Sequence, residues 1–338
     1  MTLKGKPHSL RNETLAGGAG GTGLGYLGVM ICLSITLTFV FGQGALWAQP
    51  KPTLRVSGSS TLLPVTETAA EEYLKKRPDL LLTVSGTGTG EGIRSLIDGN
   101  IDIADASREV KGEEYDRARK GGVELIRHDI ALDCLAVIVH PSNPLTDISL
   151  SDLKAIYVGD VVNWKQVGGP DMVIVPINRD SSSGTFEMWI EEVLNGARHR
   201  PDAQVQSSSG GVAYAVSGNR YAIGYVSLGF LSDGVKALSV GGVKPSHETA
   251  ADGRYPIVRE LYMYVRGDHG PEADKFLDFI YSPEGRQIIT DTGFLPPKQA
   301  AGAATEAGEP VVGGAEGAGT AAGEPVRGAE GPGTAAGK

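Results

Sequence analysis

The chain has 338 residues, of which 41% are hydrophobic and 21% charged, the composition of a soluble globular protein with one large or two medium domains. Its formal net charge of −9 argues against a nucleic-acid-binding surface and against any general attraction for anions, so an anion site would have to be built locally. Only two cysteines occur, Cys32 and Cys134, and removal of the N-terminal segment that holds Cys32 would leave a single thiol.

The first 48 residues have the pattern of an export signal. Basic residues precede an uncharged, mostly apolar stretch at 24–46. We predict a signal peptide over residues 1–48, with Ala48 as its last residue, and hence a periplasmic or other extracytoplasmic location. The apolar stretch approaches the length that spans a bilayer, so an uncleaved membrane anchor is the alternative.

Residues 53–139 are predicted to alternate strands and helices. Short apolar runs predict strands, at 53–56, 80–84, 101–104, 123–126 and 131–139. Helical spacing of apolar residues predicts helices between them, one that ends at Pro78, one that begins near Ile93 and one over 112–120. This order implies parallel strands with helices packed on the faces of the sheet.

A second α/β unit follows over residues 149–223. Its predicted elements are helices at 149–157, 186–194 and 212–216 and strands at 173–177 and 221–226. A strand at 256–265 and helical segments at 273–280 and 284–290 complete the folded part. Residues 299–338 are mostly Ala, Gly, Glu, Pro and Thr in repeated blocks, a composition that cannot build a packed core, so we predict a disordered tail without chemistry.

The stretch 178–185 carries the most informative motif. It joins a predicted strand to a predicted helix, so Ser183, Gly184 and Thr185 lie at the start of a helix. Backbone N–H groups there have no intrahelical partner, and the helix dipole favours negative charge. Arg179 adds a planar guanidinium that matches an oxyanion. The motif predicts an anion site; the alternative is an ordinary capped helix with a surface arginine.

Similar turns, each with small hydroxyl and glycine residues between a strand and a helix, recur at 59–61, 87–89 and 208–210. Ligands of open α/β sheets bind beyond the carboxyl ends of the strands, where several such turns would converge. The glycines at 86–92 lack the spacing of a dinucleotide fingerprint, no P-loop or nucleophile elbow occurs, and the histidines show no zinc spacing. We therefore expect no catalytic residue, no metal and no cofactor.

These motifs, taken in order, resemble those of the phosphate-binding proteins of high-affinity phosphate ABC importers. The resemblance covers residues 53–297 and rests on segments 58–64, 86–90, 102–108, 163–164, 179–185 and 222–226. It implies an α/β fold of the two-lobed periplasmic-binding-protein type, a clamp of two doubly wound lobes joined by two hinge crossings. Lobe I would comprise 53–138 and 225–297 and lobe II 139–224, with the crossings near 137–140 and 224–226.

The resemblance also implies the ligand and the partners. Inorganic phosphate would bind between the lobes and pass to the membrane permease subunits of an ABC importer. The protein would be a monomer without enzymatic turnover. The residues that the resemblance assigns to the phosphate site are Ser60, Thr61, Leu62, Thr89, Ser107, Arg108, Asp133, Arg179, Ser183, Gly184 and Thr185.

Selectivity for phosphate depends on a proton acceptor. Phosphate near neutral pH retains an O–H that a fixed carboxylate can accept, whereas sulfate has none and would be repelled by the same charge. Some members of the family hold this acceptor just after the Ala-Ser of the third motif, where this chain has Arg108. Another branch keeps Ser-Arg there and has an aspartate before the hinge strand, which matches Asp133. We therefore predict Asp133 as the acceptor, while Arg108 would either contact the anion or pair with a carboxylate.

Several alternatives stay open. Asp133 could instead be a solvated loop carboxylate. A protein of the same fold could bind another tetrahedral oxyanion such as sulfate or molybdate, or serve as a membrane-tethered phosphate sensor or adhesion protein if residues 24–46 were retained. A phosphatase is disfavoured because the sequence offers no metal-ligand pattern and no activated nucleophile.

Overall fold

The computed structural model describes residues 51–297, so the predicted signal or anchor segment and the predicted tail lie outside the described residues. Within 51–297 the chain forms a nine-stranded main sheet, ordered β2-β1-β3-β11-β4-β8-β6-β7 with β9 paired to β4, and a two-stranded sheet of β10 and β5. The strands are β1 (Thr53–Gly58), β2 (Leu81–Ser85), β3 (Ile103–Ala106), β4 (Leu125–Val139), β5 (Asp147–Ile148), β6 (Val175–Arg179), β7 (Gln204–Gln206), β8 (Ala222–Ser227), β9 (Lys236–Ala237), β10 (Ser239–Val240) and β11 (Val258–Arg266).

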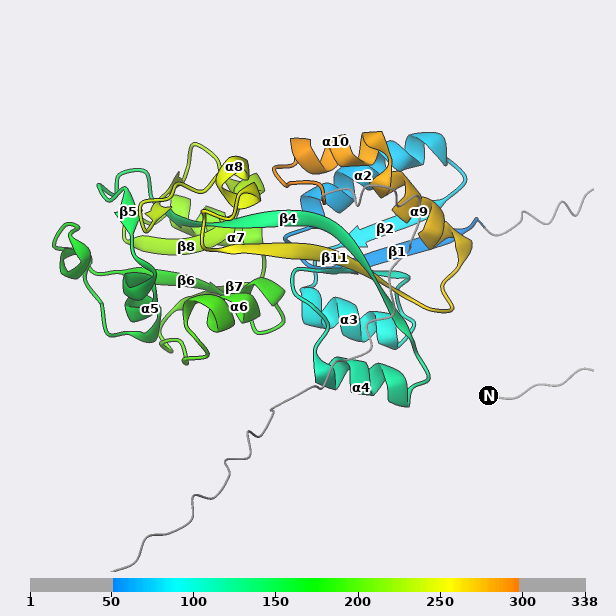
Figure 1. The fold of residues 1–338 in the computed structure, drawn as a ribbon, viewed down its shortest axis with the longest axis horizontal. Helices are drawn as coiled ribbons and strands as arrows, with labels where there is room; N and C mark the ends of the chain where they lie inside the picture. Colours follow the sequence, from blue (N-terminus) through cyan, green and yellow to red (C-terminus); the bar gives the residue numbers. More distant parts are fainter. Residues whose placement is uncertain (1–50, 298–338) are drawn as a thin grey trace, which may run out of the picture. The chain divides into compact units, whose positions relative to one another are not determined.

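Helices pack on this sheet (Figure 1). They are α2 (Leu63–Lys76), α3 (Thr89–Ile97), α4 (Gly112–Lys120), α5 (Leu150–Val158), α6 (Gly184–Met188), α7 (Ser209–Ser217), α8 (His247–Ala251), α9 (Pro271–Tyr281) and α10 (Pro283–Asp291). Short 3-10 turns occupy Trp164–Val167 and Leu228–Phe230, and α6 continues as a π-helical stretch over Trp189–Val193. The predicted α/β class is confirmed. None of the helices between residues 51 and 297 is long and apolar enough to cross a membrane.

The strand pairing follows the prediction at the N-terminal side and departs from it at the centre of the sheet. β1 pairs in parallel with β2 and β3, as the alternation of strands and helices predicted. β4 is one strand of 15 residues where two were predicted, and it pairs antiparallel with β11 and β8. The partner of Leu261 is Ala131 and that of Tyr262 is Asp129, so Ile130 forms a β-bulge that locally twists the strand.

Buried apolar side chains form separate clusters in two lobes. The first lobe contains a cluster that includes Val56 and Phe276, under α2 and α9, and another around Ile93 of α3. The second lobe contains a cluster around Trp189 and another around Val212 of α7. We use the names first lobe and second lobe for the parts of the chain that build these clusters. Each lobe therefore has its own core, as a two-lobed fold requires.

The strands β4 and β11 run through both lobes (Figure 1). Along β4, Ala131 packs in the first lobe and Cys134 in the second; Ile257, just before β11, packs in the second lobe and Leu261 in the first. These four residues mark where the chain crosses between the cores. The two-crossing hinge thus consists of one pair of antiparallel strands.

The crossings differ from the predicted hinge positions. The sequence placed residues 225–297 in the first lobe, but Leu238, Val240 and Tyr255 are buried in the second-lobe cluster. The apolar residues near 224–226 predicted a strand, but an apolar pattern does not report which of the two cores the strand packs in. We therefore propose that the return crossing lies in β11, at about Arg259, and the outward crossing at about Asp133.

Candidate anion-binding site

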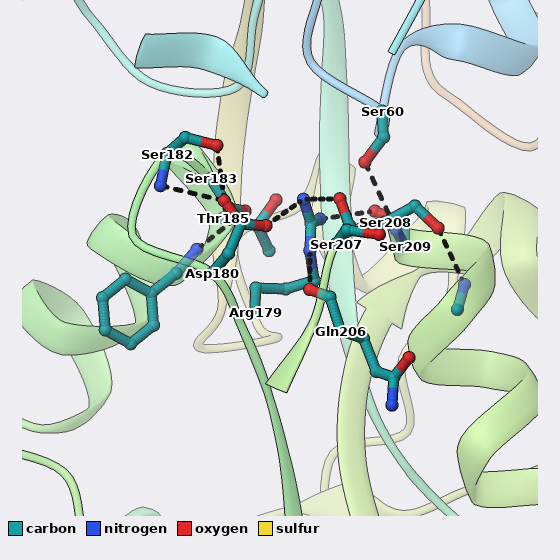
Figure 2. Close-up of polar contacts among 12 residues, drawn as sticks. Ser60, Arg179, Asp180, Ser182, Ser183, Thr185, Gln206, Ser207, Ser208 and Ser209 are labelled. Carbon is teal, nitrogen blue, oxygen red and sulfur yellow. Dashed lines mark hydrogen bonds and ion pairs between the residues drawn. The ribbon is translucent and has the colours of Figure 1, made fainter. Parts of the chain in front are cut away.

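The second lobe holds a buried arginine at the carboxyl end of β6. The side chain of Arg179 is 2% exposed. Its guanidinium donates to the carbonyl oxygens of Gln206 and Ser207, both at 3.1 Å (Figure 2). Among the described residues its carboxylate partner is Asp180, at 3.5 Å. Burial outweighs this charge and lowers the pKa of Arg179. A buried cation with so distant a counter-charge favours an anion as a further partner.

Two helices begin beside Arg179. α6 begins at Gly184 and is capped by the hydroxyl of Ser183, while α7 begins at Ser209 and is capped by Ser208. Arg179 Nη1 donates to Ser209 Oγ at 3.2 Å, which ties the guanidinium to the start of α7 (Figure 2). The positive ends of both helices therefore lie close to the guanidinium, an arrangement that attracts negative charge.

The first lobe contributes hydroxyl groups from three separate segments. Thr61 follows β1, Thr89 begins α3 and Ser107 follows β3, and all three are buried. Thr89 Oγ1 lies 3.2 Å from Ser107 Oγ and accepts a hydrogen bond from Ser107 N at 3.1 Å. Each of the three segments lies just beyond the carboxyl end of a strand of the same sheet. Residues far apart in sequence therefore meet here.

The hydroxyls of the two lobes contact one another. Thr61 Oγ1 lies 3.0 Å from Thr185 Oγ1 and 3.4 Å from Ser209 Oγ. Ser60 Oγ accepts a hydrogen bond from Ser209 N at 3.2 Å (Figure 2). Together with Arg179 these groups form one buried polar set that spans the lobes. We call it the inner cluster, and its members are Ser60, Thr61, Thr89, Ser107, Arg179, Thr185 and Ser209.

Glycines allow the lobes to approach closely. A Cβ added at Gly184 would stand 2.7 Å from Thr89 Oγ1 and 2.8 Å from Ser107 Oγ, both in the first lobe. Gly90 N donates across the lobes to Ser182 O at 3.0 Å. The predicted residues of the second lobe therefore face those of the first, in a closed arrangement.

Asp133 lies on β4 opposite Arg259 of β11. Arg259 Nε donates to Asp133 Oδ2 at 2.9 Å, and Ser227 Oγ donates to the same oxygen at 2.7 Å. Asp133 Oδ1 is buried without a hydrogen-bond partner among residues 51–297. Arg259 also donates to Thr61 Oγ1 at 3.4 Å, which joins the pair to the inner cluster. Asp133 is 1% exposed, so it is not a solvated loop carboxylate.

The guanidinium of Arg108 is held by carboxylates, one of the two roles that the sequence left open. It donates to both carboxylate oxygens of Glu114, at 2.7 and 2.9 Å, and to Glu187 of α6. Burial lowers the pKa of Arg108, but the hydrogen bonds and charges of the two carboxylates outweigh burial and the pKa lies above its ordinary value. Leu62 is buried in the apolar core of the first lobe, so only its backbone is available to a ligand.

A buried carboxyl group supports the turn that carries the first-lobe hydroxyls. Asp105 is 1% exposed, and its backbone oxygen accepts from Ser59 N at 2.8 Å. Thr66 Oγ1 donates to Asp105 Oδ2 at 2.7 Å, and Oδ1 has no partner in the described part of the chain. Burial raises the pKa of Asp105 to about 7. Within 51–297 no group of three or more acidic, histidine or cysteine side chains is placed to hold a metal ion.

Two contributors were missing from the residues predicted for the site. Ser209 lies in a hydroxyl-rich turn that the sequence did show, but it was not assigned to the ligand. Arg259 occupies the same buried phase of β11 as Leu261 and Met263, at positions two apart. An arginine in the buried phase of a strand was the available signal, because such a residue is rarely buried without a partner.

The sequence is similar to a family model and to curated proteins. A family model described as a PBP superfamily domain matches residues 43–284. The phosphate-binding protein PstS of Bacillus subtilis (strain 168) is 34% identical over 248 residues, which cover 72% of this chain and 80% of that protein. The phosphate-binding protein PstS of Borreliella burgdorferi is 32% identical over 252 residues, covering 71% of this chain and 88% of that one.

Solved structures show the same likeness. A phosphate ABC transporter substrate-binding protein from Clostridium perfringens, crystallised with bound phosphate, has a TM-score of 0.68 and 33% identity and covers 73% of this chain and 100% of its own. An ABC-type phosphate transport receptor from Vibrio cholerae has a TM-score of 0.60 and 28% identity, with 72% and 100% covered.

Two lobes that share a pair of hinge strands and enclose a polar cluster are the architecture of substrate-binding proteins of the periplasmic-binding-protein type. Sequence identity to known proteins then shows which family of this class the chain belongs to. The chain belongs to the PstS family of phosphate-binding proteins.

Proposed function

We propose that this protein binds inorganic phosphate at the inner cluster and delivers it to the membrane subunits of an ABC importer. The observation that carries the proposal is the buried guanidinium of Arg179, whose ion-pair partner in the described chain is 3.5 Å away, among hydroxyls from both lobes. A tetrahedral anion accepts hydrogen bonds in several directions. Phosphate would take the place of direct contacts such as that between Thr61 and Thr185. The similarity to proteins named as phosphate-binding supports this choice of anion.

Asp133 supplies the selectivity in this proposal. Its Oδ2 is fully engaged by Arg259 and Ser227, which fixes the carboxylate and leaves Oδ1 as an acceptor. The O–H of phosphate would donate to Oδ1. Sulfate has no such proton and would bring its charge against the carboxylate.

The proposed action is reversible binding without turnover. The protein would work outside the cytoplasm as a monomer, opening and closing by a twist of β4 and β11 near Asp133 and Arg259. The side chains of the inner cluster are hydroxyls and an arginine, groups that donate hydrogen bonds to an anion, and this composition supports a binder over an enzyme.

The test is calorimetric titration of the full chain with phosphate, sulfate and molybdate, repeated for Asp133→Asn. We expect the parent to bind phosphate with clear preference. In the variant, phosphate affinity should fall by about 10- to 100-fold, because a hydrogen bond to a charged group is worth about 1.5–3 kcal/mol. Sulfate binding should rise, because the repelling charge is gone.

A matched control is Asp171→Asn, which removes the same charge from an exposed position of the second lobe, where the side chain is 70% exposed. It should leave both affinities unchanged. Failure of the parent to bind phosphate would overturn the proposal. Preference for sulfate or molybdate in the parent would assign the site to another oxyanion.

A further inference from the structure

A second group of charges spans the lobes outside the inner cluster. Lys111 Nζ of the first lobe lies 3.1 Å from Glu187 Oε2 of the second, and Arg108 Nε donates to the same oxygen. Glu114 binds Arg108 from within the first lobe, through both carboxylate oxygens. We call Arg108, Lys111, Glu114 and Glu187 the rim cluster. The carboxylate of Glu187 thus bridges two cations on the opposite lobe.

The rim cluster lines a hollow of about 400 Å³, measured as space for water. Its four residues line the hollow together with Ser182. The side chain of Lys111 is 38% exposed and that of Glu187 is 15% exposed. An ion pair at such a position has moderate strength and responds to ionic strength.

Glu187 is also coupled to the inner cluster through its helix. It lies in the first turn of α6, which begins at Gly184 beside the hydroxyls of the first lobe. An unpaired carboxylate there would repel an anion at the start of the helix, because both carry negative charge. Contact with Arg108 and Lys111 neutralises it, and this contact exists only when the lobes are together. Closure therefore removes the charge that would disfavour the anion.

We propose that Glu187 is the closure latch of this protein, a residue that holds the two lobes together through Arg108 and Lys111 and slows the release of the bound anion. The role rests on the proposed function, because the anion in question is phosphate. Glu187 is a positioning residue in this proposal and does not itself contact phosphate. Its effect is on the rate of opening.

The experiment measures the release of radiolabelled phosphate from the full chain during a chase with unlabelled phosphate, for Glu187→Gln and for Glu91→Gln. Glu91 is the matched control, because it also lies in the first turn of a helix beside the inner cluster, α3, but its ion pair at 3.0 Å is with Arg94 of the same lobe. Both substitutions remove one negative charge near the anion. Loss of the latch should make release from Glu187→Gln about 3- to 10-fold faster than from Glu91→Gln, since interface mutations act mainly on the dissociation rate.

The same release experiment is repeated at several concentrations of sodium chloride. Chloride screens the rim ion pairs, so the release rate of the parent and of Glu91→Gln should rise with sodium chloride more steeply than that of Glu187→Gln. Equal release rates for the two variants, or equal salt slopes, would overturn the latch.

Amide exchange separates this proposal from the proposed function. Gly90 N–H donates across the lobes to Ser182 O, so its exchange in phosphate-free protein reports opening. Glu187→Gln should exchange faster at Gly90 than Glu91→Gln and the parent. If the parent binds no phosphate, the proposed function fails and the exchange rates still decide the latch. If phosphate binds and the exchange rates are equal, the latch alone fails.

Discussion

The inner cluster and the rim cluster both span the lobes and each holds an arginine, yet the two arginines have opposite electrostatic surroundings. Arg179 is buried, its carboxylate partner within residues 51–297 lies 3.5 Å away, and burial lowers its pKa. Arg108 meets two carboxylates, whose charges and hydrogen bonds raise its pKa in spite of burial. A guanidinium whose charge is incompletely balanced can recruit an anion, whereas a balanced one can only hold protein to protein. Counter-charge, and not residue type, separates the binding role that we propose for Arg179 from the structural role of Arg108.

The largest expected effect comes from removing the unbalanced cation. Arg179→Gln should weaken phosphate binding by about 100-fold or more, because the anion loses charged hydrogen bonds worth about 1.5–3 kcal/mol each. Calorimetric titration at fixed salt measures this loss. Arg94→Gln, which removes a balanced and exposed charge from the wall of the rim hollow, should change the affinity less than about twofold. If Arg179→Gln and Arg94→Gln lost phosphate affinity equally, the proposed difference between an unbalanced and a balanced arginine would be contradicted.

The next largest effect comes from a substitution that disturbs contacts between the lobes, which we expect to form only when the lobes close. In Gly184→Ala the new methyl group would meet Thr89 Oγ1 at 2.7 Å and Arg108 Cγ and Ser107 Oγ at 2.8 Å, all in the first lobe. Overpacking costs about 1–3 kcal/mol, here only upon closure, so phosphate affinity should fall by about 10-fold while thermal unfolding of the phosphate-free protein stays near that of the parent.

Gly210→Ala is the control for that substitution, since a Cβ at Gly210 meets nothing within 4 Å. It should bind phosphate like the parent. A large drop in the melting temperature of phosphate-free Gly184→Ala would show that the clash is present in the open state as well, and would contradict the assignment of the contact to closure.

The smallest expected effect is on stability, and it separates two buried carboxyl groups near the inner cluster. Asp133 is balanced by Arg259, whereas the side-chain partner of Asp105 in the described chain is the hydroxyl of Thr66, and burial raises the pKa of Asp105 to about 7. In the unfolded chain Asp105 loses its proton near the ordinary pKa of 3.8, whereas in the folded protein it keeps the proton up to about pH 7. The free energy of unfolding of the parent therefore falls as the pH rises from 3.8 toward 7. The parent should therefore lose stability relative to Asp105→Asn, by at most about 1.4 kcal/mol per pH unit.

Chemical denaturation across this pH range measures the difference between the two proteins. His128, whose pKa burial lowers to about 4, acts in an overlapping range with the opposite sign but is common to both proteins and cancels in the difference. Parallel stability profiles for parent and variant would mean that Asp105 is ionised in the folded state at low pH.

The sequence was most informative where the site is contiguous. The second-lobe residues Arg179 and Ser183 to Thr185 lie in one turn between a strand and a helix, so local pattern alone places them together. Arg259 could not be found in this way, because its role depends on the pairing of β11 with β4. The rim contact of Glu187 with Arg108 likewise depends on how the lobes meet, and the sequence offered only an acidic residue in a helix.

The fold shows the same limit. Element types followed from apolar periodicity, but the polar run Arg127 to Asp129, next to the bulge at Ile130, interrupts the apolar pattern of β4, so one strand was predicted as two. The buried clusters differ from the predicted lobe boundaries for a related reason. The strands that pass from one core to the other carry buried apolar side chains in both cores, and periodicity does not report which core a residue enters.

The strands that cross between the lobes also determine how the chain can be divided. The first lobe is built from chain on both sides of the second, and β4 pairs with β11 over one part of its length and with β8 over another. A division at the crossings would cut both β4 and β11, and the first lobe would then consist of two separate pieces of chain. The smallest continuous segment that contains a complete first lobe therefore spans both lobes.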